Sequence, residues 1–197
     1  MQKVYCITGP MAAGKNLASS FFEKHGFVSV DADLLGHRAV EIQKEKILAE
    51  FSDEAHKRGI SLTDENGNLN RRALGSLVFS SAELLKRHEA IVFPVIDSLI
   101  EQFIESHRDS PVIINATVLY KVNTIKKVNR VIFIDAPWIS RLLRARKRDK
   151  LKIFHIIQRF KAQKHLFAKY KISNADTVRV WNTGSKKSLE KRLEKYL

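Results

Sequence analysis

A glycine-rich octapeptide near the N-terminus carries the residues best suited to chemistry. It reads Gly9-Pro10-Met11-Ala12-Ala13-Gly14-Lys15-Asn16 and is followed by Leu17. Glycines allow a backbone to curl until its N–H groups point inward at an anion, and a lysine at this spacing adds a full positive charge. We predict a loop that binds the phosphates of a nucleotide. The alternative is that Gly9 and Gly14 only shape a tight strand-to-helix turn.

Asn16 is the irregular member of this stretch. The motif usually ends in Ser or Thr, whose hydroxyl holds Mg²⁺. An amide oxygen is also a hard ligand, but it lies one bond further from the backbone, and Mg²⁺ tolerates little distortion of its octahedron. We therefore expect Asn16 on the metal side of the site, with an unusually high requirement for Mg²⁺.

Two carboxylates follow the second apolar run of the chain, residues 27–30. They are Asp31 and Asp33, and the helical pattern begins directly after them. In open parallel sheets, ligands bind at the carboxyl ends of the strands, so both side chains are candidates for the site. The alternative is that they only cap the N-terminus of the following helix.

A basic segment lies in the last third of the chain. Arg141, Arg144 and Arg148 follow an i, i+3, i+7 spacing, which places them on one face of a helix. Guanidinium groups bind phosphates through paired hydrogen bonds and stabilise charge in phosphoryl transfer. We interpret this helix as a lid over a polyphosphate, with a merely solvated charged face as the alternative.

Composition limits the class of protein. The 197 residues are 44% apolar and 28% charged, as in one globular unit with a sizeable core. No apolar run reaches the roughly 20 residues that span a membrane, and the N-terminus resembles a strand rather than a signal peptide. The lone Cys6 suits a core position, so we expect a cytoplasmic protein. The net charge of +14 indicates nucleic acid or an anionic substrate as the partner.

Apolar runs alternate with helical patterns along the whole chain. Short apolar runs predict five strands at residues 3–8, 27–30, 111–115, 130–135 and 177–181. Apolar periodicity predicts helices at residues 17–25, 34–51, 71–79, 81–107, 139–148, 153–169 and, after a Ser185 cap, 185–193. Pro94 is expected to kink or split the fourth helix. This alternation predicts a parallel sheet covered by helices on both faces. The insertion at 34–107 is too long for a simple crossover, so we expect a substrate-side subdomain there.

The chain resembles dephospho-CoA kinases, a family of P-loop kinases, from Met1 to the last helix. The matching segments occur in the family's order: Thr8 with the Gly9–Lys15 loop, Asp31-Ala32-Asp33, Gly67–Leu74 with Val78-Phe79, Lys127–Val131, Arg144 to Asp149, Arg159 to Gln163, and Asp176 to Ser185.

This resemblance implies a P-loop NTPase-like three-layer α/β sandwich with a five-stranded parallel sheet. The single domain would comprise a core of about residues 1–33, 108–137 and 171–197, a helical substrate-binding insertion of about 34–107, and a lid of about 138–170. The partners would be ATP, Mg²⁺ and dephospho-CoA, with neither nucleic acid nor membrane.

The resemblance also implies roles for single residues. Catalysis would fall to Lys15, to Asp33 as the base toward the acceptor hydroxyl, and to Arg144. ATP would contact residues 9–17, Arg148, Asn182 and Gly184. The acceptor would contact Thr8, Asp33 and Arg71, and the metal would contact Asn16 and Asp31.

The sequence departs from the family at several positions. Lys121 stands where the family has Glu, Phe93 where it has His, and Asn16 where it has Ser or Thr. Two alternatives therefore stay open: another small-molecule kinase of the nucleoside monophosphate type, and a non-catalytic descendant that binds nucleotide or RNA.

Overall fold

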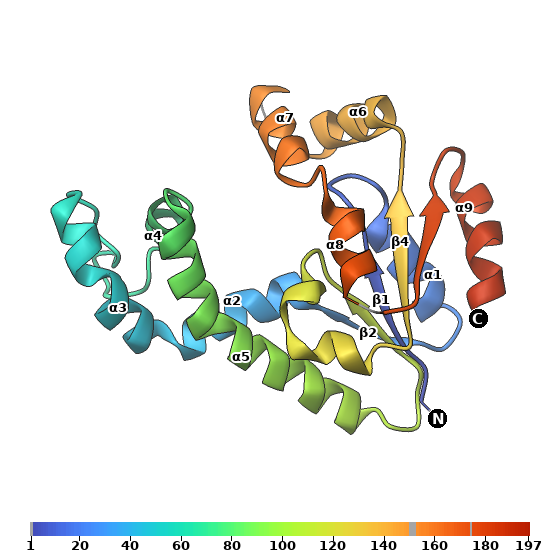
Figure 1. Ribbon diagram of the computed structural model, residues 1–197, viewed down its shortest axis with the longest axis horizontal. Coiled ribbons are helices and arrows are strands. Elements are labelled where there is room, and N and C mark those ends of the chain that lie inside the picture. The colour runs from blue at the N-terminus through green and yellow to red at the C-terminus, as the bar shows by residue number, and fades with distance from the viewer. Residues whose placement is uncertain (1, 150–152, 174) are drawn as a thin grey trace. The chain divides into compact units, whose positions relative to one another are not determined.

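The computed structural model describes residues 2–149, 153–173 and 175–197 (Figure 1). The chain forms two compact units, Met1–Asp33 with Ile100–Leu197, and Leu34–Leu99. Helices α2 (Ala32–Ile42) and α5 (Ala82–Ser106) each run from one unit into the other. Lys150 and Lys152 of the basic segment lie outside the described residues.

The first unit is built on a parallel sheet whose order is β2-β3-β1-β4-β5. The strands are β1 (Val4–Thr8), β2 (Val28–Asp31), β3 (Val112–Asn115), β4 (Arg130–Asp135) and β5 (Thr177–Trp181). All four pairings are parallel, so the predicted five-stranded parallel sheet is confirmed. The carboxyl ends of β1, β2 and β3 therefore meet at one edge.

Helices cover both faces of this sheet, as the uninterrupted apolar strands require. On one face α1 (Lys15–Glu23) packs beside α9 (Lys186–Leu193), and Phe21, Phe22 and Leu189 join the core there. On the other face lies α8 (Leu166–Ile172) (Figure 1). Its Phe167 contacts Phe133 of β4, with ring centroids 5.0 Å apart. The three-layer arrangement is thus confirmed.

Two predicted helices are each divided in the structure. The stretch 34–51 contains the end of α2 and the start of α3 (Lys44–Lys57), because Gln43 leaves the helical conformation at φ −98° and ψ 16°. The stretch 153–169 is divided into α7 (Ile153–Ala162) and α8 by a turn at residues 163–165. Apolar periodicity continues across both breaks, so it predicted one helix where there are two.

The remaining elements complete the chain. They are α4 (Arg71–Val78), α6 (Trp138–Asp149) and the short 3₁₀ helices η1 (Leu119–Lys121), η2 (Asn123–Lys127) and η3 (Glu194–Tyr196). Pro94 lies inside the single helix α5, so it does not split the helix. Ser185 caps α9 as predicted, since its Oγ accepts a hydrogen bond of 3.3 Å from the Ser188 amide.

The second unit consists of α3, α4 and the adjoining parts of α2 and α5. Its interior is apolar, with Ile47, Phe51 and Leu77 completely buried. Within the parts of the chain that the structure describes, no helix is long and apolar enough to cross a membrane.

Candidate active site

The loop between β1 and α1, residues 9–14, adopts a conformation that only glycine allows at two positions. Gly9 has φ +149°, and a Cβ atom there would lie 2.1 Å from the Ile134 carbonyl oxygen. Gly14 has φ +110°, and its Cβ would lie 2.4 Å from Nδ2 of Asn182. Both glycines therefore serve close packing as well as backbone curvature. We call residues 9–15 the phosphate loop.

A buried amide supports this loop from beneath. Asn182 follows β5, is 4% exposed, and donates from Nδ2 to the Ala13 carbonyl at 2.8 Å. Its own backbone amide donates to the Asp135 carbonyl at 2.6 Å. Asn182 was predicted to contact the nucleotide base. In the structure its side chain holds the loop, and Gly184 lies two residues further on, before α9.

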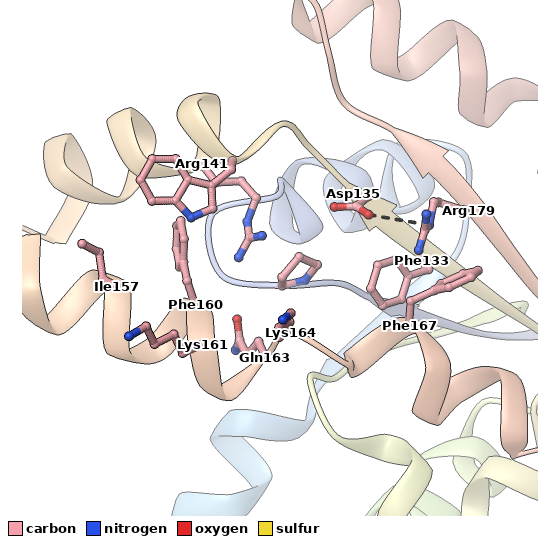
Figure 2. A pocket seen from close by; sticks show the side chains of 12 residues that line it. Phe133, Asp135, Arg141, Ile157, Phe160, Lys161, Gln163, Lys164, Phe167 and Arg179 are labelled. Carbon is pink, nitrogen blue, oxygen red and sulfur yellow. Dashed lines mark ion pairs between the residues drawn. The ribbon is translucent and has the colours of Figure 1, made fainter.

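Helix α6 and the turn that follows α7, both in the segment predicted to form a lid, contact the loop at Met11. Arg141 of α6 donates from Nε to the Met11 carbonyl at 2.9 Å, and the Met11 amide donates to Oε1 of Gln163 at 2.7 Å. The Arg141 guanidinium also lies over the Phe160 ring of α7, 4.1 Å from its centroid. Arg141, Phe160 and Gln163 line a cavity of about 490 Å³ beside the loop (Figure 2).

Arg141 is therefore separated from the other two arginines of the predicted lid face. Arg144 and Arg148 line a different cavity, of about 580 Å³, on the phosphate loop. The structure brings together there Pro10, Ala12, Ala13, Gly14, Lys15, Asn16, Leu17, Arg144, Lys147 and Arg148. Lys147 was not predicted as a site residue, although its spacing of three from Arg144 and its charge were visible in the sequence.

Arg144 lines this cavity and has one guanidinium nitrogen without a partner among the described residues. Its Nη2 donates to the Asn182 carbonyl at 3.4 Å, whereas its buried Nη1 has no hydrogen-bond partner among the described residues. A buried donor without a partner is costly, so an anionic ligand that accepts this hydrogen bond would be stabilised. The cavity combines the glycine-rich loop with four cationic side chains, which suits a polyphosphate.

Lys15 is half-buried at the start of α1. Its ammonium donates to the Thr117 hydroxyl, in the loop after β3. Burial lowers the pKa of Lys15, and the charge of Asp33 and, more weakly, that of Asp31 oppose this shift. A phosphate beside the ammonium would act in the same direction as these carboxylates.

The Thr117 loop is in turn anchored by buried hydroxyls. Tyr170 of α8 donates to the Thr117 carbonyl at 3.2 Å and accepts from the Leu119 amide at 2.9 Å. Thr8 is completely buried and donates to the same carbonyl at 3.5 Å. Its hydroxyl thus supports the loop, and its contact with an acceptor stays a prediction.

The two carboxylates differ in their surroundings. Oδ1 of Asp31 accepts a hydrogen bond of 2.8 Å from the Asp33 amide, so Asp31 caps the start of α2. Asp33 is exposed in the first turn of that helix. The charges of both carboxylates act on Lys15, so they lie near the phosphate loop; their roles stay predictions.

Asn16, the predicted metal ligand, contacts Asn115. Nδ2 of Asn115, the last residue of β3, donates to Oδ1 of Asn16 at 3.2 Å. Sequence analysis did not single out Asn115, although a polar residue that ends an apolar strand lies at the ligand-binding edge. No group of three or more His, Cys, Asp or Glu side chains in the described ranges could hold a metal ion. A metal at Asn16 and Asp31 would therefore depend on further ligands from a bound polyphosphate.

Arg71, the predicted acceptor residue, belongs to the second unit. It begins α4 and forms an ion pair of 3.2 Å with Glu41, with both side chains at least half exposed. Its role toward an acceptor stays a prediction.

Comparison with known proteins identifies the family of this site. A family model described as dephospho-CoA kinase matches residues 3–187. A dephospho-CoA kinase of Treponema denticola is 41% identical over 95% of this chain and 85% of its own length.

Solved structures agree with this assignment. The structure of TT1252 from Thermus thermophilus aligns with a TM-score of 0.81 at 27% identity, covering 99% of this chain and 96% of its own. A dephospho-CoA kinase from Campylobacter jejuni has the same fold, with a TM-score of 0.64, 23% identity, and coverage of 99% of this chain and 95% of its own. The phosphate loop and cationic cavity, and the match along nearly the whole sequence, lead to the same result: this chain belongs to the dephospho-CoA kinase family.

Proposed function

We propose that this protein transfers the γ-phosphoryl group of ATP to the 3′-hydroxyl of dephospho-CoA, which gives coenzyme A and ADP. The observation that supports this most directly is the cavity in which the phosphate loop faces Arg144, Lys147 and Arg148. Family membership supports the choice of acceptor over a nucleoside monophosphate. We also propose a cytoplasmic location, in agreement with a single, buried cysteine.

The nucleotide side acts by positioning and charge neutralisation. Phosphoryl transfer requires the attacking and leaving oxygens in line, with the developing charge stabilised by fixed donors. Loop amides and Lys15 bind the β- and γ-phosphates, and Arg144 and Arg148 approach the same phosphates from α6. Because Asn182, Arg141 and Gln163 hold the loop backbone, its donors do not need to reorganise during transfer.

Asp33 acts on the acceptor. Its exposed carboxylate orients the ribose 3′-hydroxyl and takes its proton, while Asp31 remains engaged in capping α2. Thr8 and Arg71 are proposed to position the rest of dephospho-CoA.

Mg²⁺ is proposed to enter with ATP. The Asn16 amide oxygen and the Asp31 carboxylate are hard oxygen ligands of the kind that Mg²⁺ accepts, so these residues would hold it. When bound, the ion neutralises phosphate charge.

Release of ADP from ATP and dephospho-CoA, measured with the wild type and with Asp33→Asn, tests the proposal. The substitution keeps the size of the side chain and removes its charge. Turnover should fall by roughly 10²–10⁴-fold, the scale of a positioned acid–base group, with little change in the Kd for ATP. Asp109→Asn is the matched control, because Asp109 is exposed before the opposite end of β3.

Two results would contradict this assignment. Wild-type protein that releases ADP with AMP or CMP but not with dephospho-CoA would identify another small-molecule kinase. Loss of ATP binding in Asp33→Asn would place Asp33 at the metal instead of at the acceptor hydroxyl.

A further inference from the structure

We propose that Asn16 and Asn115 act as a neutral amide pair in place of a metal-binding hydroxyl and carboxylate, so that this protein binds ATP almost equally well with and without Mg²⁺. The inference rests on the proposed function only in taking ATP as the ligand of the phosphate loop. It adds Asn115 as a residue that sets the metal dependence of nucleotide binding.

The sheet places Asn115 at the corner where a metal would lie. In register it is opposite Ile7 of β1 on one side and Asp31 of β2 on the other. It is 8% exposed, and its Nδ2 reaches Oδ1 of Asn16 at 3.2 Å. Asn16 is the residue directly after Lys15 and also lines the phosphate cavity. The two amides are therefore adjacent to the phosphates that the loop binds.

The chemistry of this pair differs from that of other P-loop proteins. These generally hold Mg²⁺ with a loop Ser or Thr and with an Asp from a neighbouring strand. In that arrangement the carboxylate repels the nucleotide phosphates unless the cation lies between them. Here both positions carry neutral amides that are hydrogen-bonded to each other. Without the metal, the amide pair itself therefore adds no negative charge beside the phosphates, and Asp31 is the carboxylate that remains at this corner.

The charges elsewhere in the cavity are consistent with the replacement of a hydroxyl and a carboxylate by two neutral amides. Lys15 and the three cations of α6 surround the phosphates, and the carboxylate of Asp31 is engaged as a helix cap. Protein cations thus supply much of the neutralisation that Mg²⁺ provides in other members of this class of fold. Of the residues that would hold Mg²⁺, only Asp31 carries a charge, and one of its oxygens already accepts the cap hydrogen bond, so the complex would bind the ion weakly.

The test is a titration of the full-length protein with a fluorescent ATP analogue, in excess EDTA and in saturating Mg²⁺, without acceptor. For the wild type the two Kd values should agree within about threefold, since neither amide repels the phosphates and the four cations of the cavity outnumber the single carboxylate of Asp31. Asn115→Asp should bind the analogue at least about tenfold more weakly in EDTA, and Mg²⁺ should restore most of the loss. In the double variant Asn16→Thr with Asn115→Asp, addition of Mg²⁺ should increase the affinity for the analogue by at least as much as in Asn115→Asp.

Asn123→Asp is the matched control, because it makes the same change at an exposed residue of η2. It should leave both Kd values unchanged. Circular dichroism melting of each variant confirms folding, and Asn16→Thr alone serves as a second probe. This variant restores the hydroxyl without adding charge, so it should lower the Mg²⁺ concentration for half-maximal turnover.

The inference is overturned by a wild type whose Kd rises tenfold or more in EDTA, or by an Asn115→Asp variant whose Kd does not respond to the metal. Because the titration contains no dephospho-CoA, its outcome is independent of the acceptor. A failure of phosphoryl transfer to dephospho-CoA would refute the proposed function and leave this result standing.

Discussion

The phosphate loop and the acceptor residue of the second unit are held in different ways. The loop backbone accepts hydrogen bonds from Asn182 and Arg141 and donates one to Gln163; these three side chains come from separate segments of the chain and are buried or half-buried. Arg71 is held by one ion pair with Glu41 at the surface. Loss of a buried hydrogen-bond partner typically costs about 1–3 kcal/mol, whereas an exposed ion pair contributes about 0–1 kcal/mol. The backbone of the phosphate loop is therefore held firmly, whereas Arg71, the proposed acceptor residue, can change partner at little cost.

The strongest test of this comparison is Lys15→Ala. Loss of the charge beside the transferred phosphate should lower kcat/KM by at least about 10³-fold, at the upper end of the effect of one preorganised donor. The melting temperature should change little, because Lys15 bonds to the Thr117 hydroxyl and is not part of the apolar core. Lys24→Ala, at the exposed end of α1, is the control. Turnover close to wild type in Lys15→Ala would remove the phosphate loop from the reaction.

An intermediate effect is expected from Arg144→Ala. Its Nη1 lacks a partner within the described residues, so a bound phosphate is its natural acceptor, and the variant should raise the Kd for ATP by about 10–100-fold. Isothermal titration with ATP measures this. Arg146→Ala provides the control, since Arg146 is exposed on the same helix and does not line the cavity. Equal losses in both variants would mean that only the overall charge of α6 matters.

The smallest effect is expected from Arg71→Ala. When the exposed Arg71 exchanges Glu41 for a phosphate of the acceptor, the ion pair contributes on the order of 1 kcal/mol to acceptor binding. Its loss in Arg71→Ala corresponds to a rise of about fivefold in KM for dephospho-CoA. The KM for ATP should not change. Steady-state kinetics with each substrate varied separately measures both, with Arg72→Ala as the neighbouring control. A loss as large as that of Arg144→Ala would overturn the comparison.

Local patterns allowed the sheet and the phosphate loop to be predicted. Each strand is a short apolar run, and the glycine spacing, Lys15 and the flanking elements are contiguous in the sequence. The confirmed strands therefore end within one residue of the predicted positions. The divided helices were missed because an apolar face can continue through a turn such as the one at Gln43.

Contacts between distant segments were the part that the sequence did not reveal. Met11 and Gln163 are 152 positions apart, and no local signal indicates that a glutamine at a helix end will accept from a loop amide. The same holds for Arg141, which shares spacing and charge with Arg144 but contacts the loop from the other cavity. Asn115 was overlooked because its importance comes from its hydrogen bond to Asn16, which lies on another element.

The thiol of Cys6 lies close to the phosphate loop but is protected from chemical modification. Cys6 is the only cysteine in the sequence and is completely buried. It lies in the middle of β1, two residues before the end of this strand, which leads into the phosphate loop. Burial raises its pKa to about 12, so almost none of it is thiolate at neutral pH. Oxidants and alkylating agents react with thiolates, and they reach a buried sulfur only when the strand separates from its neighbours. Nucleotide binding by this protein should therefore be insensitive to thiol-alkylating reagents for as long as the sheet stays closed.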